Sequence, residues 1–142
     1  MSVTYSNALP ARDEYFRLFE STGWNERYQF DAERLYGAVG KSWYLVSAYD
    51  GDRLVGFGRV ISDGVLHALI VDLIVLPSYQ GSGIGSHILD ELTNKCRSQG
   101  IPDIQLFCAR GKAGFYEKRG FVRRPADGPG MELSQFSHES EC

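Results

Sequence analysis

One stretch in the middle of the chain constrains its fold more than any other: an apolar strand that runs through a glycine-rich turn into a helix. Residues 69–76 read Leu-Ile-Val-Asp-Leu-Ile-Val-Leu, which is almost continuously apolar and rich in β-branched side chains. Such a run is typical of a central strand that is buried on both faces. The turn that follows it contains Gly81, Gly83 and Gly85, which let the backbone bend sharply.

A helix is expected directly after this turn. The apolar side chains that follow recur at a spacing that puts them on one face of a helix: Ile84, Ile88, Leu89, Leu92 and Cys96. Gly100 and Pro102 end the pattern. The first backbone N–H groups of a helix have no partner within it and carry partial positive charge. The turn is therefore a candidate seat for a phosphate or pyrophosphate group.

The glycine turn does not fit two other phosphate-binding patterns. It differs from the dinucleotide fingerprint because the third glycine follows after one residue instead of two, and no clear ribose-binding acid follows a second strand. It differs from a Walker loop because no Lys-Ser or Lys-Thr pair closes it. The turn alone leaves two interpretations open, a phosphate seat and a structural turn without a ligand.

A second motif carries a resemblance to a known family. Residues 113–121 read Ala-Gly-Phe-Tyr-Glu-Lys-Arg-Gly-Phe, which indicates a short helix that ends at Gly120 and returns into a strand. In order and spacing, residues 80–85 and 115–121 closely resemble the two signatures of the GCN5-related N-acetyltransferases (GNAT). The resemblance covers about residues 43–133, and the N-terminal part fits the family's two opening helices more loosely. It implies an α/β fold of mixed α+β type, with a central twisted mixed sheet flanked by helices on both faces.

The resemblance also implies an activity and a site. Members of the family move an acetyl group from acetyl-CoA to an amine by direct attack in a ternary complex, without a metal. The tyrosine that matches Tyr116 protonates the departing thiolate, and Phe115 packs beside the coenzyme. The turn holds the pyrophosphate of coenzyme A, and the strand before it pairs with the pantetheine arm. The residues thereby implied to bind the coenzyme are Leu73, Ile74, Val75, Gln80, Gly81, Ser82, Gly83, Ile84, Gly85, Ser86 and Phe115.

Two positions depart from the family pattern. Many members have an asparagine seven residues before the tyrosine, where this chain has Ala109, so Arg110 or Lys112 is a candidate to replace its contact. Related polyamine acetyltransferases have an acidic pair in the strand, and the first acid of the pair is the base. Here the first position is Val71, and only Asp72 is acidic.

Asp72 is the leading candidate for the base that deprotonates the acceptor amine, acting through water. An aspartate inside an apolar strand is costly to bury unless it is paired or functional, so the alternative is that Asp72 is paired within the fold. His67, one strand-length upstream, is the next candidate.

The acceptor is expected to be a primary amine of a small molecule. Trp24, Tyr28 and Phe30 lie between the first two expected helices, where they either stack on an aromatic or cationic amine or only hold the helices against the sheet. A protein lysine or N-terminal amine is the alternative acceptor. Two other classes stay open: a coenzyme A-binding module without turnover, and an ATP- or NAD-binding protein unrelated to acyl transfer.

Length and composition fit one domain. The chain has 142 residues, of which 43% are hydrophobic, and we expect a core over about residues 3–133 and a polar tail at 134–142. No run approaches ~20 apolar residues, and the N-terminus lacks a signal pattern, so no membrane association is expected. The net charge of −3 argues against a nucleic-acid partner. Homodimers are common in the family, but nothing in the sequence demonstrates one.

The three cysteines indicate a compartment. Cys96, Cys108 and Cys142 are odd in number and fit no metal-binding spacing, which favours free thiols in a reducing cytoplasm. Cys96 and Cys108 are expected in the core, and Cys142 in the tail.

The remaining elements follow from local patterns. Helices are expected at about residues 11–21, at 31–39 after the N-cap Asp31, and around Tyr116. Asp50-Gly51 and Asp63-Gly64 are turn signals between strands. The expected strands are residues 43–49, 53–62, 65–76, 104–108 and one beginning at Phe121.

Overall fold

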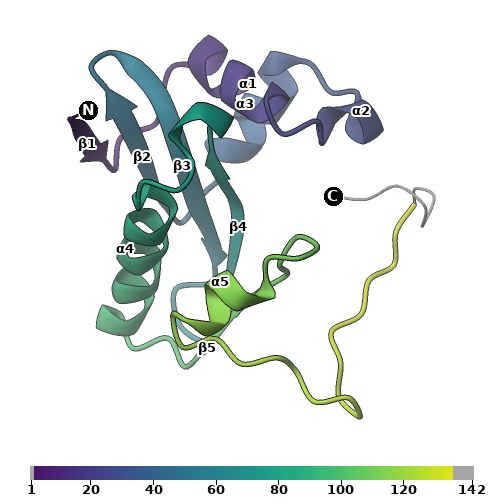
Figure 1. The fold of residues 1–142 in the computed structure, drawn as a ribbon. Helices are drawn as coiled ribbons and strands as arrows, with labels where there is room; N and C mark the ends of the chain where they lie inside the picture. The colour runs from purple at the N-terminus through teal and green to yellow at the C-terminus, as the bar shows by residue number, and fades with distance from the viewer. Residues whose placement is uncertain (1, 136–142) are drawn as a thin grey trace. The chain divides into compact units, whose positions relative to one another are not determined.

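The computed structural model describes residues 2–135, so Cys142 and most of the expected tail lie outside the described residues (Figure 1). The chain divides into two compact units, residues 1–106 and 107–142. The first unit holds the sheet and most of the helices, and the second holds the motif around Tyr116. Each unit is described by itself.

A five-stranded mixed sheet forms the first unit. Its strands lie side by side in chain order: β1 (Val3–Ser6), β2 (Tyr44–Asp50), β3 (Arg53–Ser62), β4 (His67–Val75) and β5 (Asp103–Leu106). The first four strands are antiparallel to their neighbours, whereas β4 and β5 are parallel. Hairpins at the two predicted turns join β2 to β3 and β3 to β4. The mixed sheet is as predicted, although β1 was not foreseen.

Helices begin and end close to where the sequence patterns place them. The elements are α1 (Arg12–Glu20), α2 (Asn25–Tyr28), α3 (Ala32–Val39), α4 (Ile84–Ser98) and, in the second unit, α5 (Ala113–Glu117). A short 3-10 turn, η1 (Pro77–Tyr79), precedes the glycine turn. The Oδ1 of Asp31 accepts a hydrogen bond from the N–H of Arg34 at 2.9 Å, so Asp31 is the predicted N-cap. The four-residue α2 lies between the first two expected helices, where the sequence patterns predict no helix.

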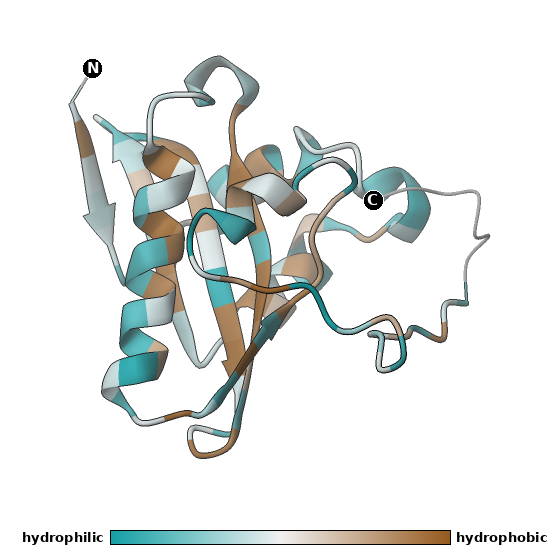
Figure 2. Cartoon of the chain, turned by 60° about the horizontal axis from the view of Figure 1, so that its bottom comes forward, coloured by the Kyte–Doolittle hydropathy of each residue, from teal (hydrophilic) through white to brown (hydrophobic). Residues whose placement is uncertain are grey.

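The helices cover both faces of the sheet, as predicted (Figures 1 and 2). Gly56 and Gly58 of β3 face α4, because a Cβ on either would lie within about 3 Å of apolar side chains of that helix, such as Ile88. Phe57, between them, points to the other face, where its ring meets the edge of Tyr15 from α1 at 5.0 Å. The core lies in these two layers, and hydrophobic residues concentrate on the central strands and on the side of α4 that faces them (Figure 2).

Two expectations about the C-terminal region are wrong. No strand forms from Phe121 in the described part of the second unit, where residues 121–135 have no regular structure. Charged residues and the four prolines and glycines of residues 125–130 interrupt any strand pattern there. Cys108 is exposed instead of buried, because β5 already ends at Leu106. Cys96 is buried on the sheet-facing side of α4, as predicted.

No helix among residues 2–135 combines the length and the apolar character that crossing a bilayer requires.

Candidate active site

The strand β4 extends beyond its neighbour β5. The two strands pair only over residues His67–Ile70 and Asp103–Leu106. Residues Val71–Val75 continue the strand and pair with β3 alone. Within the described residues, the backbone groups on the other edge of this segment therefore have no strand partner. An extended ligand that carries amide groups can hydrogen-bond along such an edge.

A β-bulge interrupts β4 in the middle of this segment. Val71 pairs with Arg59 and Ile74 pairs with Phe57, so that Asp72 and Leu73 together oppose the single residue Gly58. Asp72 has a φ of 56°, in the left-handed region that aspartate tolerates better than most residues. A bulge re-aims the backbone and side chains of a strand, and this one lies where β4 has lost its second neighbour.

The carboxylate of Asp72 is paired within the fold. The Nε of Arg59 donates a hydrogen bond to the Oδ2 of Asp72 at 2.7 Å, and the two side chains are 12% and 22% exposed. The ring of Tyr15 is buried nearby, and its pKa is raised, first by burial and then by the negative charge of Asp72. The pairing that was one alternative for Asp72 is thus present, and its role as a base stays a prediction.

The glycine turn has the backbone conformation that its sequence suggests. Gly81 and Gly83 have φ values of 82° and 89°, which other residues adopt only with strain. A Cβ on either glycine would meet nothing within 4 Å, so the turn is open to its surroundings. Its ends are held by polar side chains: Gln80 donates to the carbonyl of Val75 at 3.0 Å, and Ser82 donates to that of Tyr79 at 2.6 Å.

The N-terminus of α4 offers free donors next to this open turn. His87 makes a backbone hydrogen bond to Gly83 at 3.0 Å, and no side chain caps the helix. The N–H groups of Ile84, Gly85 and Ser86 precede that bond, so they lie among the donors that a helix cannot satisfy itself. Free donors, a helix N-terminus and open space fit a diphosphate group.

The sequence patterns do not predict the side-chain contacts that anchor η1, which precedes the glycine turn. The hydroxyl of Tyr79 donates a hydrogen bond to the Oδ2 of Asp50 at 2.6 Å, which links η1 to the β2–β3 hairpin and raises the pKa of Tyr79. The guanidinium of Arg53 lies 5.8 Å from the centre of the Tyr79 ring. Only the three-dimensional register of the hairpin reveals these contacts, since 29 residues separate Asp50 and Tyr79 along the chain.

Tyr116 and Phe115 lie on α5 in the second unit. The two rings meet edge to face at 5.1 Å, and Tyr116 also meets Phe121 at 6.0 Å. The helix ends as predicted, with Gly120 at a φ of 93° and the N–H of Phe121 bonded to the carbonyl of Tyr116 at 3.2 Å. Burial raises the pKa of the Tyr116 phenol, and Cys108 raises it further. The phenol therefore stays protonated at neutral pH.

The aromatic residues proposed for the acceptor lie around α2. Tyr28 and Phe30 are stacked with 6.0 Å between ring centres, and Trp24 packs its edge against Phe19 at 5.9 Å. The guanidinium of Arg34 lies 4.4 Å from the centre of the Phe30 ring, so an internal cation already occupies one side of this ring. Their contact with an acceptor stays a prediction.

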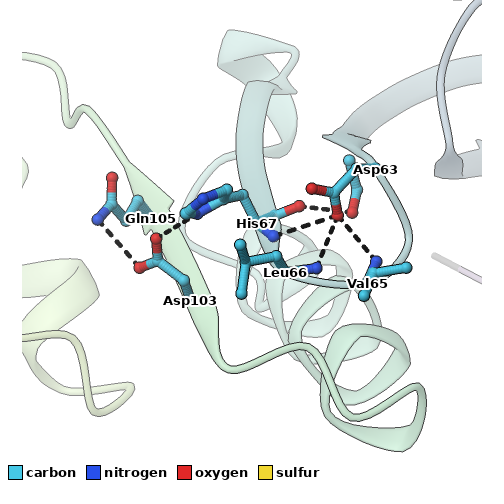
Figure 3. A network of polar contacts seen from close by, with 7 residues as sticks. Asp63, Val65, Leu66, His67, Asp103 and Gln105 are labelled. Atoms are coloured by element: carbon cyan, nitrogen blue, oxygen red, sulfur yellow. Dashed lines mark hydrogen bonds and ion pairs between the residues drawn. The ribbon is translucent and has the colours of Figure 1, made fainter.

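His67 is the first residue of β4, at the opposite end of the strand from Val75. Figure 3 shows its contacts with Asp63 and Asp103. Its Nδ1 is 2.5 Å from the Oδ2 of Asp103 on β5. Asp72 lies five residues further along the strand, a distance of roughly 16 Å. Asp63 accepts backbone hydrogen bonds from Val65, Leu66 and His67, and these bonds lower its pKa. The structure thus places His67 in a network that joins the β3–β4 turn to β5.

The described part of the chain contains no evident metal-binding site. Among residues 2–135, no group of three or more His, Cys, Asp or Glu side chains is arranged to hold a metal ion.

Comparisons with known proteins agree with this geometry. The model of the family described as "Acetyltransferase (GNAT) family" matches residues 9–121. An uncharacterized ycf52-like N-acetyltransferase of Prochlorococcus marinus is 31% identical over 79% of this chain and 63% of its own length. Rice serotonin N-acetyltransferase 2 is 34% identical over 76% of this chain and 54% of its own length. Soybean histone acetyltransferase TAP1 is 29% identical over 80% of this chain and 53% of its own length.

The similarity extends to a solved structure. A GNAT family acetyltransferase from Streptococcus pneumoniae superposes with a TM-score of 0.79 and 29% identity, over 94% of this chain and 98% of that protein. The chain spans between about half and two thirds of the length of these three curated relatives. The two motifs, the fold and these comparisons lead to one conclusion: the chain belongs to the GCN5-related N-acetyltransferase (GNAT) family.

Proposed function

We propose that this chain is an acetyl-CoA-dependent N-acetyltransferase whose acceptor is the primary amine of a small molecule. The observation that carries the proposal is the course of β4. The strand loses its second neighbour after Ile70, bulges at Asp72, and leads through η1 into an open turn at the uncapped start of α4. One continuous segment thus offers an amide-pairing edge and a diphosphate seat in sequence.

The coenzyme would bind along this segment. Acetyl-CoA supplies the acetyl thioester when bound, and the chain supplies binding and orientation. The free edge of Leu73, Ile74 and Val75 pairs with the amides of the pantetheine arm, and an N–H group there donates to the oxygen on which negative charge develops. The residues that hold the diphosphate are Gln80, Gly81, Ser82, Gly83, Ile84, Gly85 and Ser86. Phe115 packs beside the coenzyme.

Two side chains move protons in the proposed mechanism. Tyr116 gives its proton to the departing thiolate, a role that fits a phenol whose pKa is raised by burial. Asp72 accepts, through a water molecule, the proton that the acceptor ammonium must lose before it can attack. The role of Tyr116 is assigned by matching this chain to the family's motif. Asp72 is chosen because it is the acid that remains in the strand, one position after Val71, which stands at the family's base position.

The acceptor class is the finer part of the proposal. The aromatic side chains around α2, Trp24, Tyr28 and Phe30, favour a compact amine with an apolar or aromatic body. The rice relative is named for serotonin, which is an amine of this kind. The soybean relative is named for histones, so a lysine in a peptide is the second candidate.

A binding experiment tests the coenzyme first. The purified chain is titrated with acetyl-CoA, ATP and NAD in separate thermal-shift series. Ligand at a hundred times Kd adds about 2.7 kcal/mol to the stability of the folded state, so a bound ligand raises the Tm clearly. We expect a shift with acetyl-CoA only. A shift with ATP or NAD and none with acetyl-CoA would refute the proposal.

A turnover experiment then tests the acceptor. Thiol release from acetyl-CoA is followed with arylalkylamines, with polyamines and with a lysine-containing histone-tail peptide. Small amines are expected to give the higher kcat/KM. Turnover of the peptide alone would show that the acceptor is a protein lysine. Tight coenzyme binding without any turnover would indicate a coenzyme A-binding module.

A further inference from the structure

Arg59 lies where three elements of the first unit meet, and the sequence motifs assign it no role. We propose that Arg59 is a positioning residue: its guanidinium fixes the Asp72 carboxylate and the β4 bulge in the geometry that acetyl transfer needs. The inference rests on the proposed function, in which Asp72 is the base and the free edge beyond the bulge orients the acetyl group.

The contacts of Arg59 join a helix to the bulge. Its Nε donates to the Oδ2 of Asp72 at 2.7 Å, and its Nη1 donates to the carbonyl of Ala38 at 3.3 Å. Ala38 lies in the last turn of α3, and its carbonyl also accepts a backbone hydrogen bond from Lys41 at 3.1 Å, so Arg59 is a second donor to the end of this helix. The rigid guanidinium fork can satisfy both acceptors at once, which a lysine ammonium on a flexible stem does less well.

The pair is sheltered from water. The side chains of Arg59 and Asp72 are 12% and 22% exposed, so their attraction is screened less than that of a surface ion pair. Tyr15 of α1 is 2% exposed and lies within the electrostatic reach of both charges. The carboxylate thus lies against a cation from β3 and carries its charge close enough to Tyr15 of α1 to raise the pKa of that phenol.

The backbone at Asp72 explains why the pair matters for geometry. A φ of 56° is unfavourable for a residue with a Cβ, and such conformations persist where the surroundings hold them. Arg59 belongs to the last regular β3–β4 pair, opposite Val71, before the register shifts. Its side chain therefore connects the regular part of the β3–β4 ladder to the bulge. In this way it fixes the position of the Leu73 backbone on the free edge of β4.

The test compares four variants with the wild type: Arg59→Met, Arg59→Lys, Asp72→Asn and the double variant Arg59→Met/Asp72→Asn. Arg97→Met is the matched control, because Arg97 is an exposed arginine in the last turn of α4, at the far end from the glycine turn. For each protein, kcat, the KM of both substrates, the Kd of acetyl-CoA and the Tm are measured well below the melting range.

We expect Arg59→Met to lower kcat at least tenfold and to raise the Kd of acetyl-CoA by a smaller factor, because the edge that pairs with the pantetheine arm is loosened while the diphosphate seat lies elsewhere. Arg59→Lys should recover part of kcat. The double variant should be no slower than the slower single variant, because both changes break the same unit. Wild-type kcat in Arg59→Met with only a lower Tm would show a purely structural ion pair and overturn the inference.

Hydrogen exchange measured by mass spectrometry decides the matter without any turnover. In Arg59→Met, or in Arg59→Lys if the methionine variant does not fold, amides of residues 71–75 should exchange faster while those of α4 keep their protection. Unchanged exchange at the bulge, or equal loss of protection in α4, would overturn the inference. A wild type that fails to bind acetyl-CoA refutes the proposed function instead, and this exchange pattern still tests the role of Arg59 at the bulge.

Discussion

Tyr116 is the single residue on which the proposed chemistry depends most. Replacing it with phenylalanine keeps the ring contacts with Phe115 and Phe121 and removes only the proton donor. We expect Tyr116→Phe to lower kcat by roughly 10²-fold, the low end of general acid–base contributions, with an unchanged Kd for acetyl-CoA. Initial rates of product formation give kcat, and a titration with acetyl-CoA gives the Kd. Equal kcat in both proteins would assign the proton to another donor.

The pH dependence of this residue has a definite sign. Burial raises the pKa of Tyr116 above its ordinary value of about 10, so the acid form persists to higher pH than in an exposed tyrosine. If kcat falls as the pH rises towards ~10, deprotonation of Tyr116 therefore cannot be the cause. Profiles of kcat against pH for the wild type and Tyr116→Phe should keep the same alkaline limb in that range, at different heights.

Residues differ in how far the sequence predicts their role. Tyr116 and the glycines belong to local motifs, which are legible without the fold. The role of Arg59 could not be predicted from the sequence, because its contact with Asp72 depends on a β3–β4 register that shifts at the bulge. The contact of Tyr79 with Asp50 was not predicted either, because it joins η1 to the β2–β3 hairpin across 29 residues of sequence. The base role of Asp72 and the acceptor role of Trp24, Tyr28 and Phe30 stay predictions.

At the scale of elements, the glycine turn depends on conformation more than on space. Alanine at Gly81 or Gly83 would meet no atom within 4 Å but would be held at a positive φ, which costs about 1–2 kcal/mol. We expect either variant to bind acetyl-CoA roughly tenfold more weakly, because about 1.4 kcal/mol corresponds to that factor. Calorimetric titration measures the change. An affinity equal to that of the wild type would mean that the turn does not hold the ligand.

A matched control exists in α3. Gly37 lies inside that helix, has no positive φ, and an added Cβ would also meet nothing within 4 Å. Gly37→Ala should raise the free energy of unfolding by about 0.5–1 kcal/mol and leave coenzyme binding unchanged.

The contact between β3 and α4 depends on space. A Cβ on Gly58 would lie 2.8 Å from Cγ2 of Ile88 and 3.0 Å from Cδ1 of Leu92, both of them fully buried. Overpacking of this kind typically costs 1–3 kcal/mol, so Gly58→Ala should lower the free energy of unfolding by about that amount. Urea denaturation monitored by tryptophan fluorescence gives the value. No loss of stability would show that the helix can shift at little cost.

Elements with strong local signals were predicted well, and those that depend on tertiary pairing were not. The capping aspartate of α3 and the apolar stripe of α4 lie within a few residues of one another, so they appear in the sequence itself. The strand β1 has only four residues and forms by pairing with β2, which no local pattern announces. The strand expected from Phe121 is the opposite error. The motif around Tyr116 predicts a strand after its helix, but the residues that follow pair with no other strand in the described part of the chain.

At the scale of the whole molecule, stability should reside in the first unit. Leu92 is fully buried between α4 and the sheet, whereas Leu133 in the second unit is 98% exposed. We expect Leu92→Ala to cost about 2–5 kcal/mol, which corresponds to a Tm lower by roughly 6–15 °C. Leu133→Ala should leave the Tm within about 1 °C, since it removes no buried surface. Scanning calorimetry compares them, and equal Tm losses would contradict this assignment of the core.

The family, the mixed sheet and the covered faces could all be anticipated, because two motifs in the right order suffice to identify the scaffold. The division into two compact units could not, since it depends on contacts between distant segments. The reducing cytoplasm suggested by the cysteines is a prediction that subcellular fractionation can test.

The tight seam at Gly56 and Gly58 has a consequence for mutational tolerance. A side chain at Gly58 would push α4 away from β3, because its Cβ would lie 2.8 Å from Ile88, and a Cβ at Gly56 would press on Ile84 at the start of the helix at 3.0 Å. In a saturation library selected for activity, position 58 should therefore accept almost nothing but glycine, and position 56 only the smallest side chains. A tolerance map would mark them as strongly as catalytic residues, although our proposal gives them no contact with either substrate. Position 37, exposed on α3, would accept many substitutions in the same library.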